Sequence, residues 1–451
     1  MPVPHVNTGD TAWMLTSAAL VMFMTPGLAL FYGGLVRAKN VLATVMQSFI
    51  ALAVVSVVWA LIGYTLAFGP DKSLFIGGFK YFLLRGVGPT PHELAPTIPS
   101  GVFMSFQLMF AIITPALITG AFAERMKFSG WLLFLTLWSV LVYSPLAHWV
   151  WGGGWLGFGW LGALDFAGGT VVHINAGVAA LACALYLGKR RGFGQEAFVP
   201  HNVPMVILGA AILWFGWFGF NAGSAVASGA LASSAFVATH LATAAAVLGW
   251  LLPEYLKHGK ATTVGAATGA VAGLVAITPA SGYVAPLPAL VIGFAAGFVC
   301  FWAVNMKFRM GYDDSLDVVG VHMVGGIVGA LLTGVFASLV INSAGAEGGI
   351  SQLGKQAVAV GITLVFTFVM TMIILKVVDL VTGLRVSEEE EVAGLDLSEH
   401  SEVGYTFTDR GGSLAHAAER AAPPEVRVSE TQTAPESPPV REPAETRGGG
   451  R

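Results

Sequence analysis

Two stretches of this sequence share one pattern: DFAGGTVVHINAG (165–177) and DDSLDVVGVHMVGG (313–326). Each contains Asp-x7-His-x3-Gly and runs into a long apolar segment, so His173 and His322 fall where membrane-spanning helices are expected. Ionisable side chains are costly at bilayer depth and usually mark a functional site. The same pattern in two halves of one chain predicts a duplicated fold with a site between the halves.

The composition is that of an integral membrane protein. Of the 451 residues, 55% are hydrophobic and only 11% are charged, whereas soluble domains carry roughly 25% charged residues. The charges cluster in short gaps between apolar runs of bilayer-spanning length. We therefore expect an all-α polytopic protein of the cell membrane, embedded in the lipid bilayer and without a nucleic-acid partner. Cys183 and Cys300 lie inside apolar runs and are expected to be buried and unpaired.

Eleven apolar segments are long enough to be membrane spans, and residues 1–383 are expected to form the transmembrane domain. The segments cover about 11–35, 41–68, 99–123, 129–150, 168–188, 201–222, 231–252, 261–279, 285–306, 318–340 and 354–382. The Gly- and Trp-rich stretch WGGGWLGFGWLG (151–162) separates the fourth and fifth spans. It is predicted to be an interfacial loop, because tryptophan is favoured at the membrane surface.

The distribution of Lys and Arg predicts the orientation. Eleven of these residues lie in the loops after the odd-numbered spans and four after the even-numbered ones up to the tenth. The positive-inside rule then places the N-terminus outside and the C-terminus inside. Spans one to five and six to ten form two halves that enter the membrane in opposite directions, with the two histidines on the last span of each half. The eleventh span lies outside this inverted repeat.

Beyond the last span the composition changes. Residues 384–410 are charged but keep apolar residues in VAGLDL, together with His400 and Tyr405. The acidic run at 388–391 alone would indicate a solvated face, but the apolar residues favour a cytoplasmic segment that docks. Residues 411–451 are rich in Pro and Glu and are predicted to be disordered, because such a segment cannot bury enough apolar surface to fold.

A pair of membrane histidines has several possible roles. A single buried histidine can simply bond a backbone carbonyl, but two at repeat-equivalent positions favour function. A neutral pair that shares one N–H offers a donor and an acceptor to a small permeant that exchanges protons. A metal site would need a third ligand, and no Cys, Glu or second His lies nearby in either span. We therefore predict neither a metal nor a cofactor.

With these features the chain resembles the ammonium transporter family (Amt/Mep/Rh), especially its bacterial and archaeal Amt branch. The resemblance covers roughly residues 7–410. It is carried by GDTAWMLTSAALVMFMTPGLALFYGGLVRAKN, GAFAER, DFAGGTVVHINAG, FGWFGFNAGSA, DDSLDVVGVHMVGGIVG and EEEEVAGLDLSEHSEVGY. It implies eleven spans and an inverted five-plus-five repeat, in agreement with the count above. It also implies a homotrimer with one pore in each subunit.

The resemblance implies roles for four residues along the pore. His173 and His322 would be paired pore histidines that touch through a shared proton. Phe110 and Phe220 would form a stacked aromatic gate above them, although most phenylalanines in such spans serve ordinary packing.

The resemblance also implies an outer recruitment site lined by Trp151, Ser224 and either Phe106 or Phe110, with Asp165 near it. Cation–π attraction would hold ammonium there. Asp165 itself precedes a helix, where aspartate most often acts as an N-cap, so we rank that role ahead of proton acceptance. Capping also accounts for the three aspartates that open the tenth span: Asp313, Asp314 and Asp317.

The expected function is transport of ammonium and ammonia, with methylammonium as an analogue. Ammonium would be recruited outside and deprotonated, and ammonia would pass the histidines. A passive ammonia pore fits the same motifs. The tail would couple neighbouring subunits and bind a PII-type signalling protein. Two alternatives are an ammonium sensor that signals through its tail, although no fused signalling domain is evident, and an intramembrane acid–base enzyme, although no nucleophile or metal set is evident.

Overall fold

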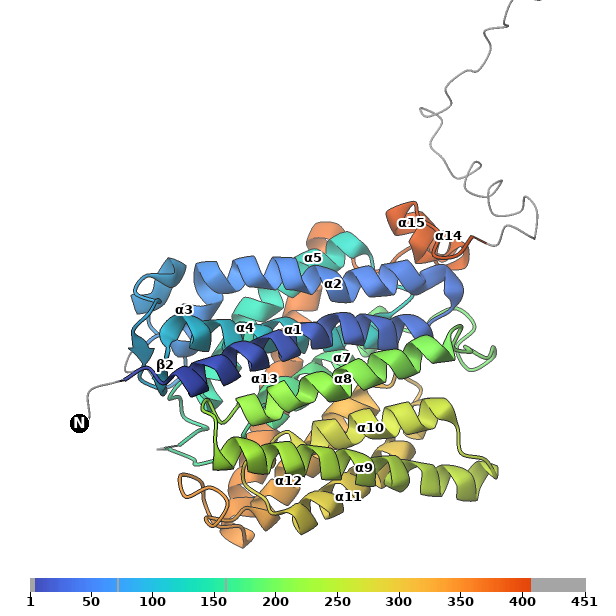
Figure 1. Ribbon diagram of the computed structural model, residues 1–451. Coiled ribbons are helices and arrows are strands. Elements are labelled where there is room, and N and C mark those ends of the chain that lie inside the picture. The colour runs from blue at the N-terminus through green and yellow to red at the C-terminus, as the bar shows by residue number, and fades with distance from the viewer. Residues whose placement is uncertain (1–4, 71–72, 159, 407–451) are drawn as a thin grey trace, which may run out of the picture. The chain divides into compact units, whose positions relative to one another are not determined.

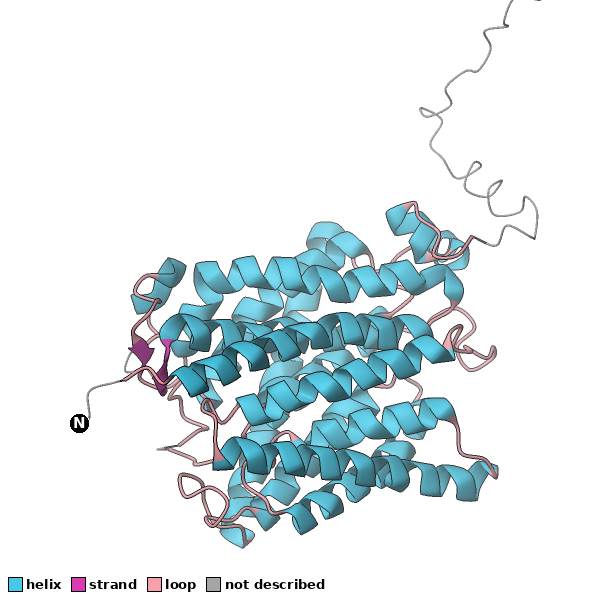
Figure 2. Ribbon diagram, viewed as in Figure 1, coloured by secondary structure: helices cyan, strands magenta, loops and turns pink. Residues whose placement is uncertain are grey.

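The computed structural model describes residues 5–70, 73–158 and 160–406, and these form an almost entirely helical bundle (Figures 1 and 2). Ten of the described helical segments are long and apolar enough to cross a membrane, and α10, Thr263–Ile277, is a shorter apolar helix. Together they are the eleven spans expected. The prediction of an all-α polytopic membrane protein is confirmed. Residues 411–451, predicted to be disordered, lie outside the described residues.

The first half contains five spans, three of them built from consecutive helical segments. They are α1 (Thr8–Leu35); α2 (Val41–Val58) with η2 (Trp59–Gly63) and α3 (Tyr64–Phe68); α4 (Ser100–Phe122); α5 (Phe128–Trp138) with η4 (Ser139–Tyr143) and α6 (Ser144–Val150); and η5 (Gly169–Ile174) with α7 (Asn175–Leu187). Short 3-10 helices, η1 (Ala38–Asn40) and η3 (Phe79–Leu84), and a small hairpin of β1 (Pro91–His92) and β2 (Ala95–Pro99) lie between spans.

The second half repeats this order. It consists of α8 (Val203–Gly223), α9 (Ala230–His258), α10, α11 (Pro286–Met310), and η6 (Val319–Met323) with α12 (Val324–Phe336). The extra span is α13 (Ile350–Thr382), and two short helices of the tail follow it, α14 (Glu388–Ala393) and α15 (Leu395–His400).

One predicted boundary was wrong in an instructive way. We expected the seventh span at about 231–252, but α9 continues through Pro253 to His258. The helix ends at Gly259, which has a φ of +72°. A glycine in the left-handed conformation is a common helix terminator, so Gly259 sets the end of α9.

Within each of the two halves, corresponding helices pack against each other in the same way. Helix α1 packs on α4 and α4 on α7, just as α8 packs on α10 and α10 on α12. The first helices of the halves, α1 and α8, lie side by side along much of their length (Figure 1). Glycines permit this approach, since a Cβ on Gly209 would lie 2.3 Å from the backbone N of Phe31. Small residues at such crossings are typical of membrane helices.

Opposite ends of the bundle carry different attachments. At the start of α1, the backbone N–H of Asn7 donates to Thr97 O of the hairpin at 2.8 Å. Helices α14 and α15 lie at the other end (Figure 1), where Lys39 donates to the backbone of the tail. A loop that the charge distribution assigned to the cytoplasm therefore contacts the tail.

Candidate functional site

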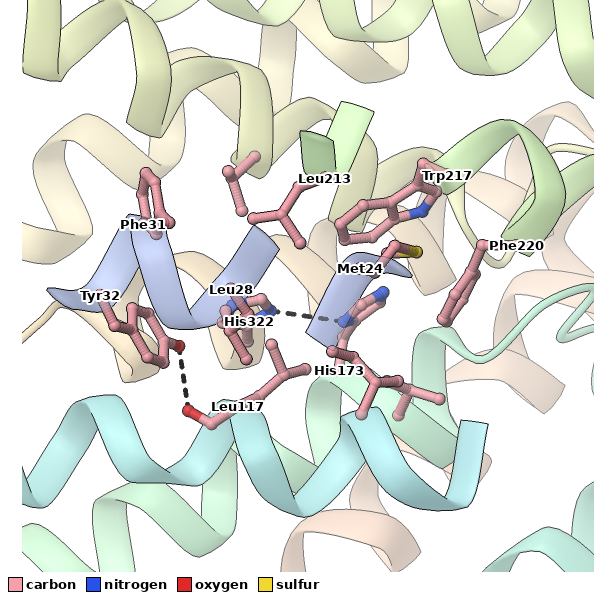
Figure 3. A pocket seen from close by; sticks show the side chains of 13 residues that line it. Met24, Leu28, Phe31, Tyr32, Leu117, His173, Leu213, Trp217, Phe220 and His322 are labelled. Carbon is pink, nitrogen blue, oxygen red and sulfur yellow. Dashed lines mark hydrogen bonds between the residues drawn. The ribbon is translucent and has the colours of Figure 1, made fainter. Parts of the chain in front are cut away.

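The two histidines of the repeated pattern meet in the middle of the bundle. His173 lies on η5 and His322 on η6, and both segments are π-helical turns. Their Nδ1 atoms are 3.3 Å apart and both side chains are buried (Figure 3). Single π-helical turns inside α-helices are rare and occur frequently at functional sites. The sequence predicted the pair, but nothing in it indicated the π-helical turns.

The glycine of each pattern explains why the histidines can meet. A Cβ on Gly177 would lie 2.3 Å from the backbone N of Met323, the residue after His322. A Cβ on Gly326 would lie 2.9 Å from a side-chain atom of Ile174, the residue after His173. Each glycine thus faces the histidine segment of the other half. The glycine of each His-x3-Gly motif therefore allows a close contact with the opposite half, and the two contacts together bring the histidine segments side by side.

The geometry of the pair fixes what it can offer a ligand. One Nδ1 must carry a hydrogen and donate it, while the other Nδ1 accepts. In neutral rings the first histidine then has a bare Nε2 and the second has an Nε2–H. The Nε2 of His173 is buried and has no hydrogen-bond partner among the described residues. Buried polar atoms normally have partners, so this nitrogen is available to a transient one.

Around the pair lies a narrow, apolar cavity of about 10 Å³. This is about the volume that one water-sized molecule requires. The ring of His173 stacks on that of Trp217, with centroids 5.4 Å apart. Figure 3 shows Phe220 near one end of the cavity and Tyr32 near the other. Such a space suits a single small molecule with a polar group and cannot hold a hydrated ion.

A second, wider cavity of about 380 Å³ lies among the loops that the charge distribution places outside. Trp151, Phe110, Ser224 and Asp165 line it. The hydroxyl of Ser224 donates to Phe220 O at 2.8 Å, which leaves its oxygen lone pairs free to accept. Four of the residues predicted for an outer site therefore share one cavity.

Two phenylalanines separate the cavities. Phe110 lines the outer one and Phe220 the inner one, and their ring centroids are 4.3 Å apart. The rings are tilted by 40° rather than stacked in parallel. Phe106 does not line either cavity but packs against Phe110 from behind, with centroids 4.9 Å apart. Of the two phenylalanines that we considered for the outer site, the structure places Phe110 there.

Asp165 organises the start of η5. Its Oδ1 accepts the N–H groups of Gly168 and Gly169 at 2.8 and 2.6 Å. Its Oδ2 accepts those of Thr170 and Val171 at 2.8 and 3.2 Å and also the hydroxyl of Thr170. Five donors satisfy the carboxylate, so this hydrogen bonding is of the capping kind expected from the sequence.

A buried charge network closes the cytoplasmic end. Glu124 pairs with Arg37 at 2.7 Å and with Arg190 at 3.2 Å, and Arg190 also pairs with Asp313 at 2.9 Å. Burial by itself would raise the pKa of Glu124, but the hydrogen bonds and positive charges of the two arginines hold it below its usual range. The network joins the loops that follow spans one, three, five and nine.

The tail is tied to the same loops. Glu391 is buried, and it accepts the backbone N–H of Arg191 at 2.7 Å. Lys39 donates to the carbonyl of Glu391 at 2.9 Å. Asp396 accepts the N–H of Ala43, at the start of the second span, at 2.8 Å. Only the last glutamate of the acidic run is therefore docked.

Two aromatic residues extend this contact. The ring of His400 lies 5.0 Å from that of Phe128, centroid to centroid. The hydroxyl of Tyr405 lies 2.9 Å from Nε2 of His201, which precedes α8. Since a carbonyl, Val36 O, lies 2.8 Å from the other ring nitrogen of His201, that nitrogen donates and Nε2 accepts from the tyrosine.

Within residues 5–70, 73–158 and 160–406, no group of three or more His, Cys, Asp or Glu side chains could hold a metal ion. The site therefore consists of an outer aromatic cavity, a partition formed by the rings of Phe110 and Phe220, and an inner cavity with two histidines. A multi-pass membrane protein with this site is a transporter or channel for one small, hydrogen-bonding permeant.

Comparison with known proteins identifies the permeant. Residues 12–405 match the model of the Ammonium Transporter Family. The ammonium transporter of Bacillus subtilis (strain 168) is 53% identical over 405 residues, which cover 89% of this chain and 99% of the relative. The crystal structure of Candida albicans Mep2 superposes with a TM-score of 0.81 at 38% identity and covers 86% of this chain and 88% of that chain. A solved structure named Sensor Amt Protein has a TM-score of 0.80 at 30% identity, with 87% and 98% covered.

The chain therefore belongs to the ammonium transporter family. Its function is ammonium transport, it is a multi-pass protein of the cell membrane, and it is not an enzyme.

The sequence did not single out every residue of the site. Tyr32, Phe31 and Trp217 line the inner cavity but lie in spans full of aromatic residues. Trp217 could have been found, because it precedes Phe220 by three positions and therefore shares its helix face. Nothing in the single sequence distinguished Phe31 and Tyr32 from packing residues.

Proposed function

We propose that each subunit carries ammonium from the outer cavity through the partition of Phe110 and Phe220 and past His173 and His322. Ammonium binds outside as a cation, loses a proton near the partition, and crosses the inner cavity as ammonia. The observation that carries this proposal is the contact between the two histidines inside a cavity of about 10 Å³.

The outer cavity supplies two kinds of attraction. The ring face of Trp151 attracts a cation, and this attraction grows as the cation loses water. The oxygen of Ser224 accepts a hydrogen bond from ammonium, which Na⁺ cannot give. Asp165 adds a negative charge at the wall of the same cavity. The three groups together favour a cation that is also a hydrogen-bond donor.

The inner cavity then selects for the neutral form. K⁺ has a size similar to that of ammonium but cannot lose a proton. Bringing it into an apolar space without its water would carry a large desolvation cost. Ammonia meets the bare Nε2 of one histidine as a donor and the Nε2–H of the other as an acceptor. The pair can also pass a proton along its shared Nδ1–Nδ1 contact, because each imidazole ring can both donate and accept a hydrogen.

The test replaces each pore histidine with alanine in the full chain reconstituted in proteoliposomes. We expect His173→Ala and His322→Ala to lose ammonium uptake or its selectivity over K⁺, while the protein remains folded. His258→Ala is the matched control, because His258 is exposed at the cytoplasmic end of α9. Wild-type uptake and selectivity in both pore variants would refute the proposal.

We further propose that residues 384–410 regulate transport, with 1–383 as the transport domain and 411–451 as a separate segment. The contacts of Glu391 and Asp396 with the cytoplasmic loops support this division. The family resemblance adds a homotrimer and a PII-type signalling protein that binds at the cytoplasmic face.

A sensor function is the second candidate, and the likeness to the structure named Sensor Amt Protein favours it. Robust labelled uptake by the purified protein argues for a transporter. A tail that changes its contacts with ammonium, in a protein without uptake, would argue for a sensor.

A further inference from the structure

The aspartates of the two patterns have different hydrogen bonding. Asp165 accepts five donors, as described above. Asp314 is also buried, but its Oδ2 accepts only the N–H of Val319, at 2.7 Å. Its Oδ1 accepts no hydrogen bond of normal geometry from any described residue. Leaving a buried carboxylate oxygen without a partner is costly, so the inner aspartate requires an explanation that the outer one does not.

The sequence accounts for the missing donors. Five residues after the aspartate, the first copy has Thr170, whose hydroxyl donates, and the second has Val319, which has none. Three residues after the aspartate, the first copy has Gly168 and the second has Asp317, each with a positive φ. Asp317 brings a second negative charge close to Asp314. The inverted repeat therefore keeps the position of the carboxyl group but removes what would stabilise its charge.

The nearby cations are bound elsewhere. Lys307 donates to the backbone carbonyl of Asp314 at 2.7 Å and to the carboxylate of Asp317 at 2.5 Å. Arg125 donates to the backbone carbonyl of Asp313 at 2.5 Å. Among the ion pairs of the described residues, none involves the carboxylate of Asp314.

The segment that carries Asp314 lies behind the inner end of the pore. A Cβ on Gly120 would lie 2.7 Å from both the ring end of Tyr32 and the side chain of Val318. The ring of Tyr32 and this segment therefore meet at Gly120. Tyr32 also lines the inner cavity together with His322, at the end away from the aromatic partition (Figure 3).

The charge state of Asp314 responds to this environment. Burial raises the pKa of its carboxyl group to about 6, and the charge of Lys307 and the N–H groups of Val318 and Val319 oppose that rise only in part. A carboxyl group with a pKa close to the working pH can both take and give a proton. The charged and titratable groups around it are Lys307 on α11, Tyr32 on α1, Arg125 after α4, and Asp317 and Tyr312 on its own segment.

We propose that Asp314 is the residue that holds and releases the proton at the cytoplasmic end of the pore. This inference rests on the proposed function, in which ammonium gives up a proton outside and ammonia crosses alone. The proton that moves along His173 and His322 protonates the Asp314 carboxylate. The resulting carboxylic acid transfers that proton to the lone pair of ammonia, which leaves as ammonium and regenerates the carboxylate. One ammonium and one positive charge cross in each cycle.

The test compares three variants of the full chain in proteoliposomes by ammonium-evoked current and labelled methylammonium uptake. Asp314→Asn keeps the shape and the acceptor for Val319 but cannot carry a proton. We expect its current to fall about ten-fold or more at an interior pH of about 7.5, and its interior-pH profile to flatten. Asp314→Glu should restore current and profile in large part. Asp317→Asn removes a neighbouring charge that is partly exposed and that raises the pKa of Asp314, so it should keep most of the current and shift the pH profile to lower pH.

Three results would overturn the inference. The first is wild-type current and pH profile in Asp314→Asn. The second is an equal loss in Asp317→Asn, which would indicate a general effect of negative charge at the inner mouth. The third is labelled uptake without current in the wild type, which would leave ammonium transport intact but remove the proton step. Absence of uptake in the wild type would instead refute the proposed function itself.

Discussion

A single added methyl group at Gly177 should separate the two pore histidines. A Cβ there would lie 2.3 Å from the backbone N of Met323 and 2.6 Å from its Cα. Ordinary van der Waals contact begins at about 3.4 Å, so backbone rather than a flexible side-chain tip must move by about 1 Å. Met323 follows His322, whose Nδ1 is only 3.3 Å from that of His173. A displacement of this size takes the pair out of hydrogen-bond range.

We therefore expect Gly177→Ala to be destabilised by about 1–3 kcal/mol, as is typical of overpacking, and to lose most of its ammonium uptake. The measurements are thermal unfolding in detergent and labelled uptake in proteoliposomes. Gly361→Ala is the matched control, because Gly361 lies in α13 and a Cβ there would meet nothing within 4 Å. That variant should be as stable as wild type or slightly more so. If Gly177→Ala behaves like Gly361→Ala in both assays, the close contact does not set the histidine geometry.

Three further expectations concern the two ends of the pore and the tail. Trp151→Leu should reduce uptake more at low than at high external ammonium, because the cation–π term acts on binding; an equal fractional loss at all concentrations would show that Trp151 serves only as an interfacial anchor. Truncation after Gly383 should change flux or the binding of a PII-type protein, whereas truncation after Gly411 should change neither. In the folded protein the pKa of Asp314 is about 6, above its usual value of 3.8, so the charged carboxylate lowers the free energy of unfolding. This loss of stability is absent below about pH 4 and complete above about pH 6. The free energy of unfolding of Asp314→Asn should therefore exceed that of wild type by up to about 3 kcal/mol at about pH 8, with no difference at about pH 4.

The sequence predicted those features of the protein that stand out from an ordinary apolar span. A histidine in an apolar span is energetically costly, so His173 and His322 could be identified from the sequence. Lys and Arg are divided unequally between the loops, so the orientation of the eleven spans could be predicted as well. The docking of Glu391 could not, because four successive glutamates look alike and only the fold buries the last of them. Phe106 and Phe110 lie one helical turn apart on α4 and share its face, so only the structure could place Phe110 at the partition and Phe106 behind it.

The residues missed by sequence reasoning share a physical reason. Phe31 and Tyr32 are aromatic residues in a span where aromatic residues also pack against neighbours and lipid. Nothing in their local pattern separates a pore wall from a core. The π-helical turns were missed because no residue pattern marks them in the sequence. The reciprocal contacts of Gly177 and Gly326 were missed because they join residues about 150 positions apart in the chain.

The inverted repeat also explains why a pore built from two similar halves can differ at its ends. The crossing glycines and the paired histidines are the same in both copies, so the centre of the pore is nearly symmetric. The residues after each aspartate are not: Gly-Gly-Thr begins three positions after Asp165, and Asp-Val-Val begins three positions after Asp314. The first set supplies donors to the carboxylate beside the outer cavity, and the second supplies fewer donors and adds another carboxylate. A fixed charge suits the capture of a cation, and a carboxyl group that can be protonated suits its release. The two ends of the pore therefore differ in these three positions, while the fold supplies the same frame around both aspartates.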